Sequence, residues 1–205
     1  MNERGFLQAY FAIPLQLSNQ VRKAFAAFFL LVLIGFVTGM MRPGSLDSIL
    51  IAFTDNAASA GLYQLEGGAL LATILANNLL AALIAIAAGL VPFVPLAALT
   101  IGLNALMFGA FGAYYHYSGL GIAAYLAGTL PHAVVEIPAL MIACGAGLYL
   151  SIAVTGGVLG RVTGHSVASV LGSCLRVYIH WVIPLMTVSA FFETYVTPRI
   201  FEQFI

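Results

Sequence analysis

The chain is poor in charged residues and in cysteine, and each shortage excludes classes of protein. Only 7% of its 205 residues are Asp, Glu, Lys or Arg, against roughly 25% in an average soluble domain. No charged residue stands between Glu66 and Glu136, a stretch of 69 residues from 67 to 135. This composition excludes a soluble enzyme, and it fits a protein whose helices cross a membrane several times.

The sequence also lacks the features of several other functional classes. The seven basic residues are balanced by seven acidic ones, so the chain has no basic surface for a nucleic acid, and we expect no such partner. Cys144 and Cys174 stand in apolar sequence without CxxC spacing, which gives no support for a disulfide framework or a thiolate metal site. No recognised hydrolase motif or phosphate-binding loop is present. Catalytic residues are therefore unknown, and enzymatic activity is left open.

The long apolar runs predict an all-α fold, a polytopic transmembrane helical bundle with about five spans. We expect residues 1–23 to form an interfacial or cytoplasmic segment, 24–198 a single transmembrane domain, and 199–205 a C-terminal tail. Within the domain we expect a polar loop over 42–68 and an interfacial connector over 155–177. The runs expected to span the membrane are 24–41, 69–91, 96–113, 132–154 and 178–196.

The segment from 119 to 154 has an unusual length. Its 36 residues are too many for one span of about 20 and too few for two. Pro131 would break it, either into two short helices or into a half-helix over 120–130 that stops at mid-depth before a full helix. The first alternative gives six crossings and the second gives five.

The basic residues favour five crossings. With a cytoplasmic amino terminus, five crossings put five of the seven basic residues inside, and six crossings put only four there. The five are Arg4, Arg22, Lys23, Arg161 and Arg176, and Arg42 and Arg199 are outside. We therefore predict a multi-pass protein of the cell (inner) membrane with a broken or re-entrant half-helix near residues 120–131.

Two acidic residues, Glu136 and Glu193, stand inside apolar runs. An ionisable group at membrane depth costs a few kcal/mol, so it is kept where it faces protein, water or a partner. His132 precedes Glu136 by four residues, which places both side chains on one helix face. Pro131 frees backbone groups at this point, and that is tolerated where they are buried or line a polar cavity. The sequence thus predicts a polar element within the membrane.

Three interpretations of His132, Glu136 and Glu193 stay open at this point. They could form a hydrogen-bonded cluster that specifies helix packing, the ligands of a divalent metal ion of the zinc type, or part of a proton or ion pathway. The spacing differs from the HExxH pattern of zinc proteases. No cofactor is certain, and a divalent metal is the one that these residues suggest.

A further polar pair, Asn77 and Asn78, lies in the second expected span. Adjacent helical residues point about 100° apart, so the two amides cannot both face one neighbour. Amides in membrane helices often serve as hydrogen bonds between helices. Small residues at several positions would also let helices pack closely, and we expect that a homodimer is one state of the protein.

These polar elements resemble a known family. The stretch 130–139, Leu-Pro-His-Ala-Val-Val-Glu-Ile-Pro-Ala, followed by Ile-Ala-Cys-Gly-Ala-Gly-Leu at 142–148, resembles the signature of the stage II sporulation protein M family of integral membrane proteins. Asn77-Asn78 and the closing Ala-Phe-Phe-Glu-Thr-Tyr-Val-Thr-Pro at 190–198 look like its other recurrent elements, in the same order. The resemblance covers about residues 22–199. It departs at Ala133, where the family more often has Gly.

The resemblance implies a function. In spore formers the family member works with membrane-anchored peptidoglycan-degrading proteins and has no hydrolase domain of its own. By resemblance, this chain would be a multi-pass membrane scaffold that recruits or localises such cell-wall-remodelling partners, with roles in sporulation. An intramembrane metal-binding protein or metal-dependent enzyme is the alternative, and a small transporter subunit is the third. The positions that the resemblance implies to be functional are Asn77, Asn78, His132, Glu136, Glu193, Thr197 and Pro198.

Overall fold

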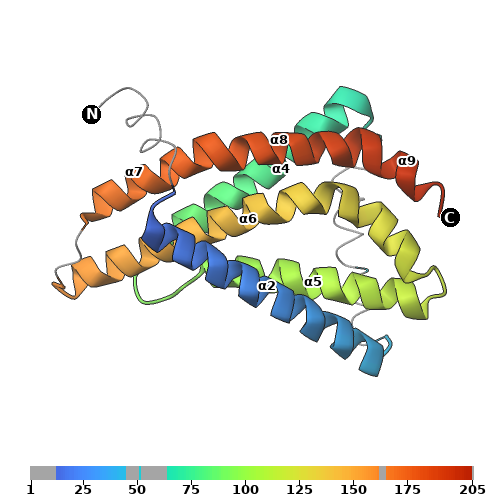
Figure 1. The fold of residues 1–205 in the computed structure, drawn as a ribbon, viewed down its shortest axis with the longest axis horizontal. Helices are drawn as coiled ribbons and strands as arrows, with labels where there is room; N and C mark the ends of the chain where they lie inside the picture. The colour runs from blue at the N-terminus through green and yellow to red at the C-terminus, as the bar shows by residue number, and fades with distance from the viewer. Residues whose placement is uncertain (1–12, 45–50, 52–63, 162–164, 205) are drawn as a thin grey trace.

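A computed structural model describes residues 13–44, 51, 64–161 and 165–204, and within them the chain forms helices and short connections without a strand. Five stretches are long and apolar enough to cross a membrane, and they lie side by side as a bundle (Figure 1). The all-helical bundle with five spans is therefore confirmed. The helices are α2 (Leu15–Met41), α4 (Gly67–Ala87), α5 (Ala97–Tyr117), α6 (Ile122–Val158), α7 (Val167–Val177), α8 (Ile183–Phe191) and α9 (Thr197–Phe201).

Three short helical turns extend these elements. A 3-10 turn, Ala88–Leu90, continues α4, and the π-helical turns Tyr178–Val182 and Phe192–Val196 join α7, α8 and α9. The last span is therefore one continuous helical stretch from Val167 to Phe201, and it begins well before the expected residue 178.

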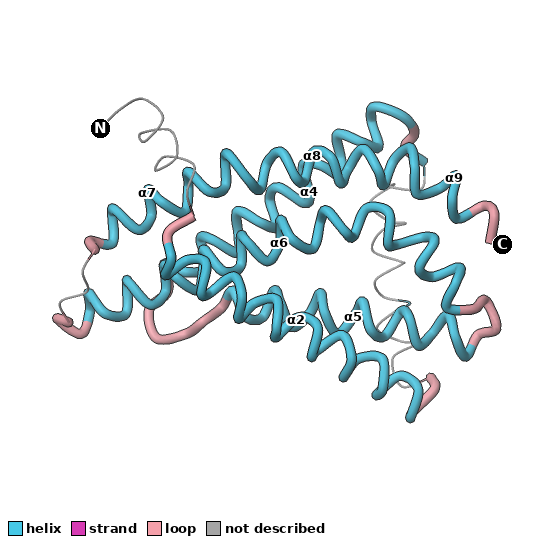
Figure 2. Tube along the Cα trace, viewed as in Figure 1, coloured by secondary structure: helices cyan, strands magenta, loops and turns pink. Residues whose placement is uncertain are grey.

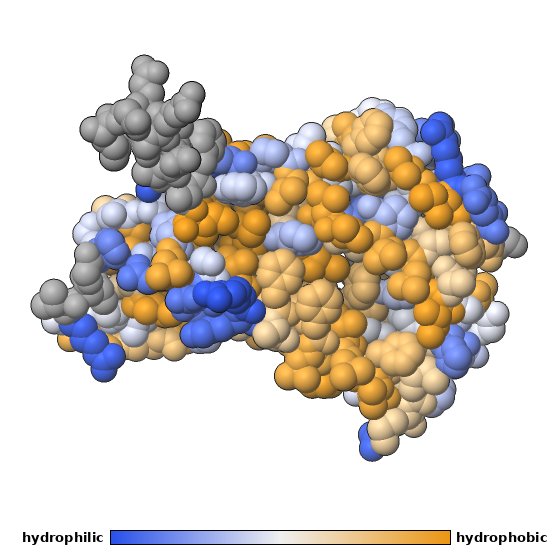
Figure 3. All heavy atoms as spheres, viewed as in Figure 1, coloured by the Kyte–Doolittle hydropathy of each residue, from blue (hydrophilic) through white to orange (hydrophobic). Residues whose placement is uncertain are grey.

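Successive spans run in opposite directions along the long axis of the bundle (Figures 1 and 2). Apolar side chains cover the middle of the face shown in Figure 3, and hydrophilic ones gather toward the two ends. Four basic residues lie toward one end of the bundle. Arg22 and Lys23 stand near the start of α2, Arg161 stands in the loop after α6, and Arg176 stands on α7. Arg42 and Arg199 stand at the ends of α2 and α9 at the other end. This distribution is the one expected for five crossings.

The break expected near residues 120–131 is a bend within α6. This helix continues from Ile122 to Val158 with Pro131 and Pro138 inside it, and its first part turns away from the rest (Figure 2). A proline removes one backbone hydrogen bond and kinks a helix, but it need not end it. Packing holds the first arm in place, since Gly128 lies against the Phe201 ring of α9. This corrects the expectation of a separate re-entrant half-helix.

Helix α6 supplies most of the core. Its central residues, 139–147, are all buried, and most of them are small. A Cβ on Gly147 would overlap the Ala85 carbonyl of α4, and one on Gly145 would lie 2.8 Å from the Val21 nitrogen of α2. Small residues thus let α6 touch the backbones of two neighbouring helices, as is usual between membrane helices. Cys144 lies in this core as a free, buried thiol, and Cys174 on α7 is likewise free and buried.

Helices α2 and α5 cross in a similar way. A Cβ on Gly35 would overlap the Leu106 carbonyl oxygen, and a Cβ on Gly109 would overlap the Val32 carbonyl oxygen. Each helix therefore offers a glycine to the backbone of the other. This reciprocal contact brings together two spans that are not neighbours in the sequence.

The expected segments outside the spans lie only partly within the described residues. Residues 1–12 and most of the loop over 42–68 are outside them. Helix α2 begins at Leu15, directly after Pro14, so the helix of the first span starts before residue 24. Between α6 and α7 only 159–166 are non-helical or outside the described residues, and the interfacial position of the 155–177 connector stays a prediction.

Candidate intramembrane metal centre

Three ionisable side chains converge between α6 and the last span. His132 and Glu136 come from α6, and Glu193 comes from the π-helical turn between α8 and α9. One possible metal-ligand atom of each lies within 4.8 Å of the others. Within the described parts of the chain this is the one such group of three His, Cys, Asp or Glu residues. The structure thus brings together the three residues that the sequence singled out.

The local sequence explains why α6 presents two of them. His132 and Glu136 are four residues apart and therefore share one face, about one turn from each other. They stand just after the Pro131 bend, and both side chains are half-buried. The bend places this pair beside the last span rather than in the tightly packed centre of α6, where most of residues 139–147 are small.

The position of Glu193 depends on a π-helical turn. Phe192–Val196 ends two residues before Pro198, which stands in the first turn of α9. Tyr178–Val182 precedes Pro184 in the same way. Because proline has no N–H to donate, the ladder of i to i−4 hydrogen bonds is interrupted, and the turn before it widens. Such π-bulges are frequent at functional sites.

Two hydroxyl groups border the three side chains. Thr197 Oγ1 lies 3.2 Å from His132 Nδ1. Ser189 Oγ lies 3.3 Å from the His132 carbonyl oxygen and 3.4 Å from Glu136 Oε2. A serine hydroxyl carries one proton, so it donates to one of these two acceptors at a time. Both hydroxyl residues are buried, and both come from the last span.

Sequence reasoning missed Ser189. Its signal is its spacing, since it precedes Glu193 by four residues. Serine is common in membrane helices as a hydrogen-bonding residue, so this spacing alone did not distinguish it.

The donor set suits a zinc-type ion. Imidazole nitrogen and carboxylate oxygen are ligands of Zn²⁺, and three protein ligands leave a fourth position for water or another ligand. Ligand atoms about 2.0–2.1 Å from a tetrahedral zinc lie roughly 3.4 Å apart. The ligand atoms of the present group lie within 4.8 Å of one another, so side-chain movements of about 1 Å would bring them to zinc-binding distances.

Thr197 gives His132 a defined orientation. Metal-binding histidines usually donate their second ring N–H to a nearby acceptor, which fixes the tautomer. When His132 Nδ1 donates to Thr197 Oγ1, Nε2 remains available to a metal. The hydroxyl at position 197 thus fits the role of a partner that positions a ligand.

The remaining predicted residues lie outside this ligand group. Asn77 on α4 is exposed, and Asn78 is half-buried on the face that also carries the buried Ala82 and Ala85. The two amides therefore point in different directions, as their adjacency requires. Pro198 stands in the first turn of α9, beside Thr197. Functional roles for Asn77, Asn78 and Pro198 stay predictions.

Comparison with known proteins identifies a family. The family model described as Stage II sporulation protein M matches residues 24–198, which is most of the chain. No curated protein and no solved structure matches the chain. The matched range overlaps all five spans, leaving out the start of the first and residues 199–201 of the last, and it contains all three converging side chains. The chain therefore belongs to the stage II sporulation protein M family of membrane proteins.

Proposed function

We propose that this membrane protein binds one divalent metal ion of the zinc type inside the bilayer, through His132, Glu136 and Glu193. The observation that carries this proposal is the convergence of three ligand atoms within 4.8 Å. Two of these residues, Glu136 and Glu193, come from different helical segments and are 57 positions apart in the sequence. Ionisable side chains inside a membrane cost free energy unless they have a partner, and these three are gathered from distant segments of an otherwise apolar protein.

Electrostatics supports a cation at this place. Two carboxylates a few ångströms apart repel each other strongly in surroundings of low dielectric constant. Helices α6 and α8 and the turn that carries Glu193 contain no Lys or Arg that could offset this repulsion, and Arg199 of α9 is exposed. A divalent ion would neutralise both carboxylates and would use the imidazole as a third ligand. It would also tie the bent part of α6 to the last span.

A bound metal would leave one coordination position free. Such an open position is typical of catalytic zinc sites, where the ion binds and polarises a water molecule. The buried hydroxyl of Ser189 stands near Glu136 and is a group that such a water could meet. The chain's own residues thus supply the ligands, a polar neighbour and an apolar enclosure.

Metal analysis of the purified protein tests this proposal. The full chain is isolated without chelator, supplied with zinc, and freed of excess metal before elemental analysis. We expect about one zinc per chain in the wild type and in the matched control His165→Ala, whose side chain is exposed just before α7. We expect loss of the metal in His132→Ala and Glu193→Gln. A wild type that retains no zinc after this treatment contradicts the proposal.

A second function is favoured by the family match. As a member of the stage II sporulation protein M family, the chain would act as a scaffold that recruits or localises membrane-anchored peptidoglycan-degrading proteins at the cell (inner) membrane. Its spans offer broad apolar faces, including the exposed Phe29, Leu30 and Leu33 of α2. These faces are suited to lipid and to partner helices, or to a second copy of the chain.

Recovery of partners tests the scaffold proposal. The protein is isolated from its own cells in a mild detergent after cross-linking, and the bound proteins are identified by mass spectrometry. Enrichment of a wall-active membrane protein over an unrelated five-span control supports the proposal. Failure to enrich such a protein counts against it, whatever the metal content of the sample.

A further inference from the structure

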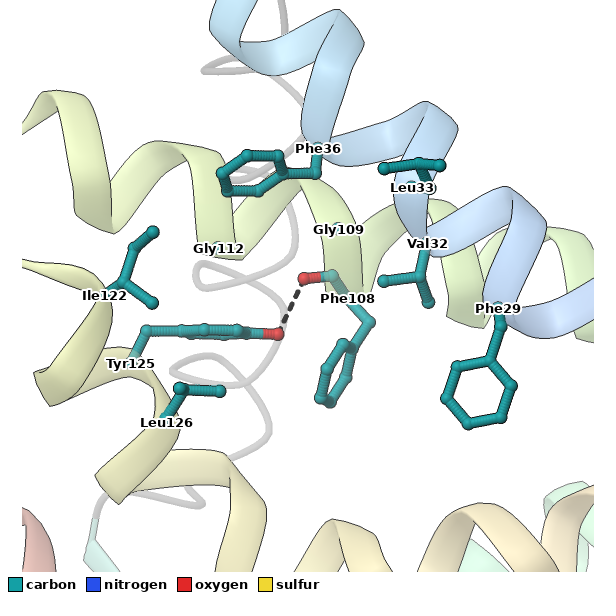
Figure 4. A pocket seen from close by; sticks show the side chains of 10 residues that line it. All are labelled: Phe29, Val32, Leu33, Phe36, Phe108, Gly109, Gly112, Ile122, Tyr125 and Leu126. Carbon is teal, nitrogen blue, oxygen red and sulfur yellow. Dashed lines mark hydrogen bonds between the residues drawn. The ribbon is translucent and has the colours of Figure 1, made fainter.

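An apolar groove of about 310 Å³ lies on the side of the bundle away from α4 and α8. Four of its ten lining residues come from α2, three from α5 and three from the first arm of α6 (Figure 4). None of the three converging ligand residues lines it. It is therefore a separate feature from the candidate metal centre.

The groove offers nothing to a polar ligand. Its lining contains no charged side chain, and its one polar side chain is Tyr125. The Tyr125 hydroxyl already donates a hydrogen bond of 2.6 Å to the Phe108 carbonyl oxygen (Figure 4). Phe29 and Leu33, which line the groove from α2, are 62% and 57% exposed. The groove thus opens on a face of the spans that meets lipid, and its chemistry suits a hydrocarbon chain.

A glycine keeps this space open. A Cβ on Gly112 would lie 3.2 Å from the Tyr125 ring and 3.4 Å from the Phe36 ring. Those rings belong to α6 and α2, so any larger residue at 112 would push the two walls of the groove apart or fill the space between them. The space is large enough for part of a lipid tail, since its volume is about ten times the roughly 30 Å³ that one water molecule occupies in the liquid.

Polar groups gather at one end of the groove. His116 is exposed and stands one turn beyond Gly112 on the same face of α5. The Tyr115 ring lies 5.6 Å from the Tyr125 ring, and Arg42 follows the end of α2. Tyrosine, histidine and arginine at helix ends are typical of the headgroup region.

Among the residues that the structure describes, the acidic groups at this end belong to other helices. Glu66 precedes α4 and Glu202 follows α9, and neither helix lines the groove. The two helix ends that do border it, those of α2 and α5, carry Arg42 and His116. The positive guanidinium of Arg42 and a ring N–H donor of His116 favour a negatively charged headgroup.

We propose that this groove binds one acyl chain of an anionic phospholipid, whose phosphate lies at the C-terminal ends of α2 and α5 beside Arg42 and His116. The chain fills the space between Leu33 of α2 and Leu126 of α6. It therefore supports the first arm of α6, which leads directly into Pro131 and the ligand pair.

A photoreactive lipid tests this assignment. The full chain is placed in vesicles of phosphatidylglycerol that contain a trace of phosphatidylglycerol with a diazirine in its acyl chain, and labelled peptides are mapped by mass spectrometry. We expect labelling to concentrate on α2 and on the first arm of α6. Leu33→Trp fills the groove and should reduce this labelling at least fivefold. The matched control Leu30→Trp, at an equally exposed position of α2 outside the groove, should change it less than twofold.

Several results would overturn the assignment. Labelling spread evenly over the exposed residues of all five spans would show ordinary surrounding lipid. Equal labelling of the two tryptophan variants would exclude the groove, and disulfide-linked dimers of Leu33→Cys without lipid labelling would show a second copy there. Ile122→Trp serves in place of Leu33→Trp should that variant not fold, as judged by gel filtration.

The headgroup is tested by changing the lipid. We expect labelling by the phosphatidylglycerol probe to exceed labelling by a phosphatidylcholine probe at least threefold. The paired substitution Arg42→Gln and His116→Gln should remove that preference without moving the labelled peptides. A preference that is absent in the wild type, or unchanged in the paired variant, overturns the placement of the phosphate.

Discussion

The crossing of α2 and α5 allows a sharp test of how closely the helices pack. In Gly109→Ala the new Cβ would overlap the Val32 carbonyl oxygen and lie 2.7 Å from the Phe36 nitrogen. Both atoms belong to the backbone of α2, so no side-chain rotation can make room. Since ordinary contact begins near 3.4 Å, the Phe36 nitrogen alone requires α2 and α5 to separate by about 0.7 Å at this point, and the closer Val32 carbonyl oxygen requires more. Overpacking of this kind costs about 1–3 kcal/mol.

Gly102→Ala is the matched control. It makes the same substitution on the same helix, but a Cβ at Gly102 would have no neighbour within 4 Å. Alanine favours a helix over glycine by about 1 kcal/mol, and this gain is common to both variants. The difference in unfolding free energy between them therefore isolates the steric cost, and we expect it to be about 1–3 kcal/mol, with Gly109→Ala the less stable.

Reversible unfolding in mixed detergent micelles measures this difference. The wild type and both variants are titrated with a denaturing detergent and followed by far-ultraviolet circular dichroism. Gly102→Ala should unfold at or above the wild-type midpoint, and Gly109→Ala below it. Equal midpoints for the two variants would refute the close crossing of α2 and α5.

Three other predictions concern the candidate metal centre and the core. Thr197→Val should weaken zinc binding by about 10–100-fold, because His132 loses the acceptor that orients it, whereas Thr197→Ser should stay near wild type; titration with a competing zinc chelator measures both. Zinc occupancy should fall on acidification, because protons compete for all three ligands, and dialysis over a pH series followed by elemental analysis shows whether it does. Cys144 and Cys174, both 0% exposed, should react with a maleimide at least tenfold more slowly than a cysteine placed at Ser118, which is exposed directly after α5, and comparable rates would contradict their burial.

The sequence was sufficient to predict the membrane fold. The interval without charge from 67 to 135 and the apolar runs predicted an all-helical bundle with five spans, and both features are present. Hydrocarbon excludes exposed polar backbone, so long apolar runs have almost no alternative to helices. The pairing of His132 with Glu136 followed from the period of the helix in the same way.

Features that depend on packing between distant segments could not be predicted. The consequence of Pro131 depends on whether neighbours hold both arms of the helix, and the contact of Gly128 with Phe201 is invisible in the sequence. The π-helical turn that positions Glu193 and the approach of Ser189 also arise from tertiary structure. The groove requires three helices that no local pattern brings together.

The crossing of α2 with α5 also bears on how the protein is made. Spans are synthesised in order from the amino terminus, and the glycine of α2 that meets α5 is Gly35, whereas its counterpart is Gly109. During synthesis the face of α2 that packs on α5 therefore has no partner helix while α4 is made and inserted. Helix α6, which packs on both α2 and α4, is made later still. The contact of α2 with α5 is thus delayed until the third span is inserted, and the packing of α2 and α4 on α6 until the fourth is inserted. Before the third span arrives, a chaperone or insertase can still hold the first span.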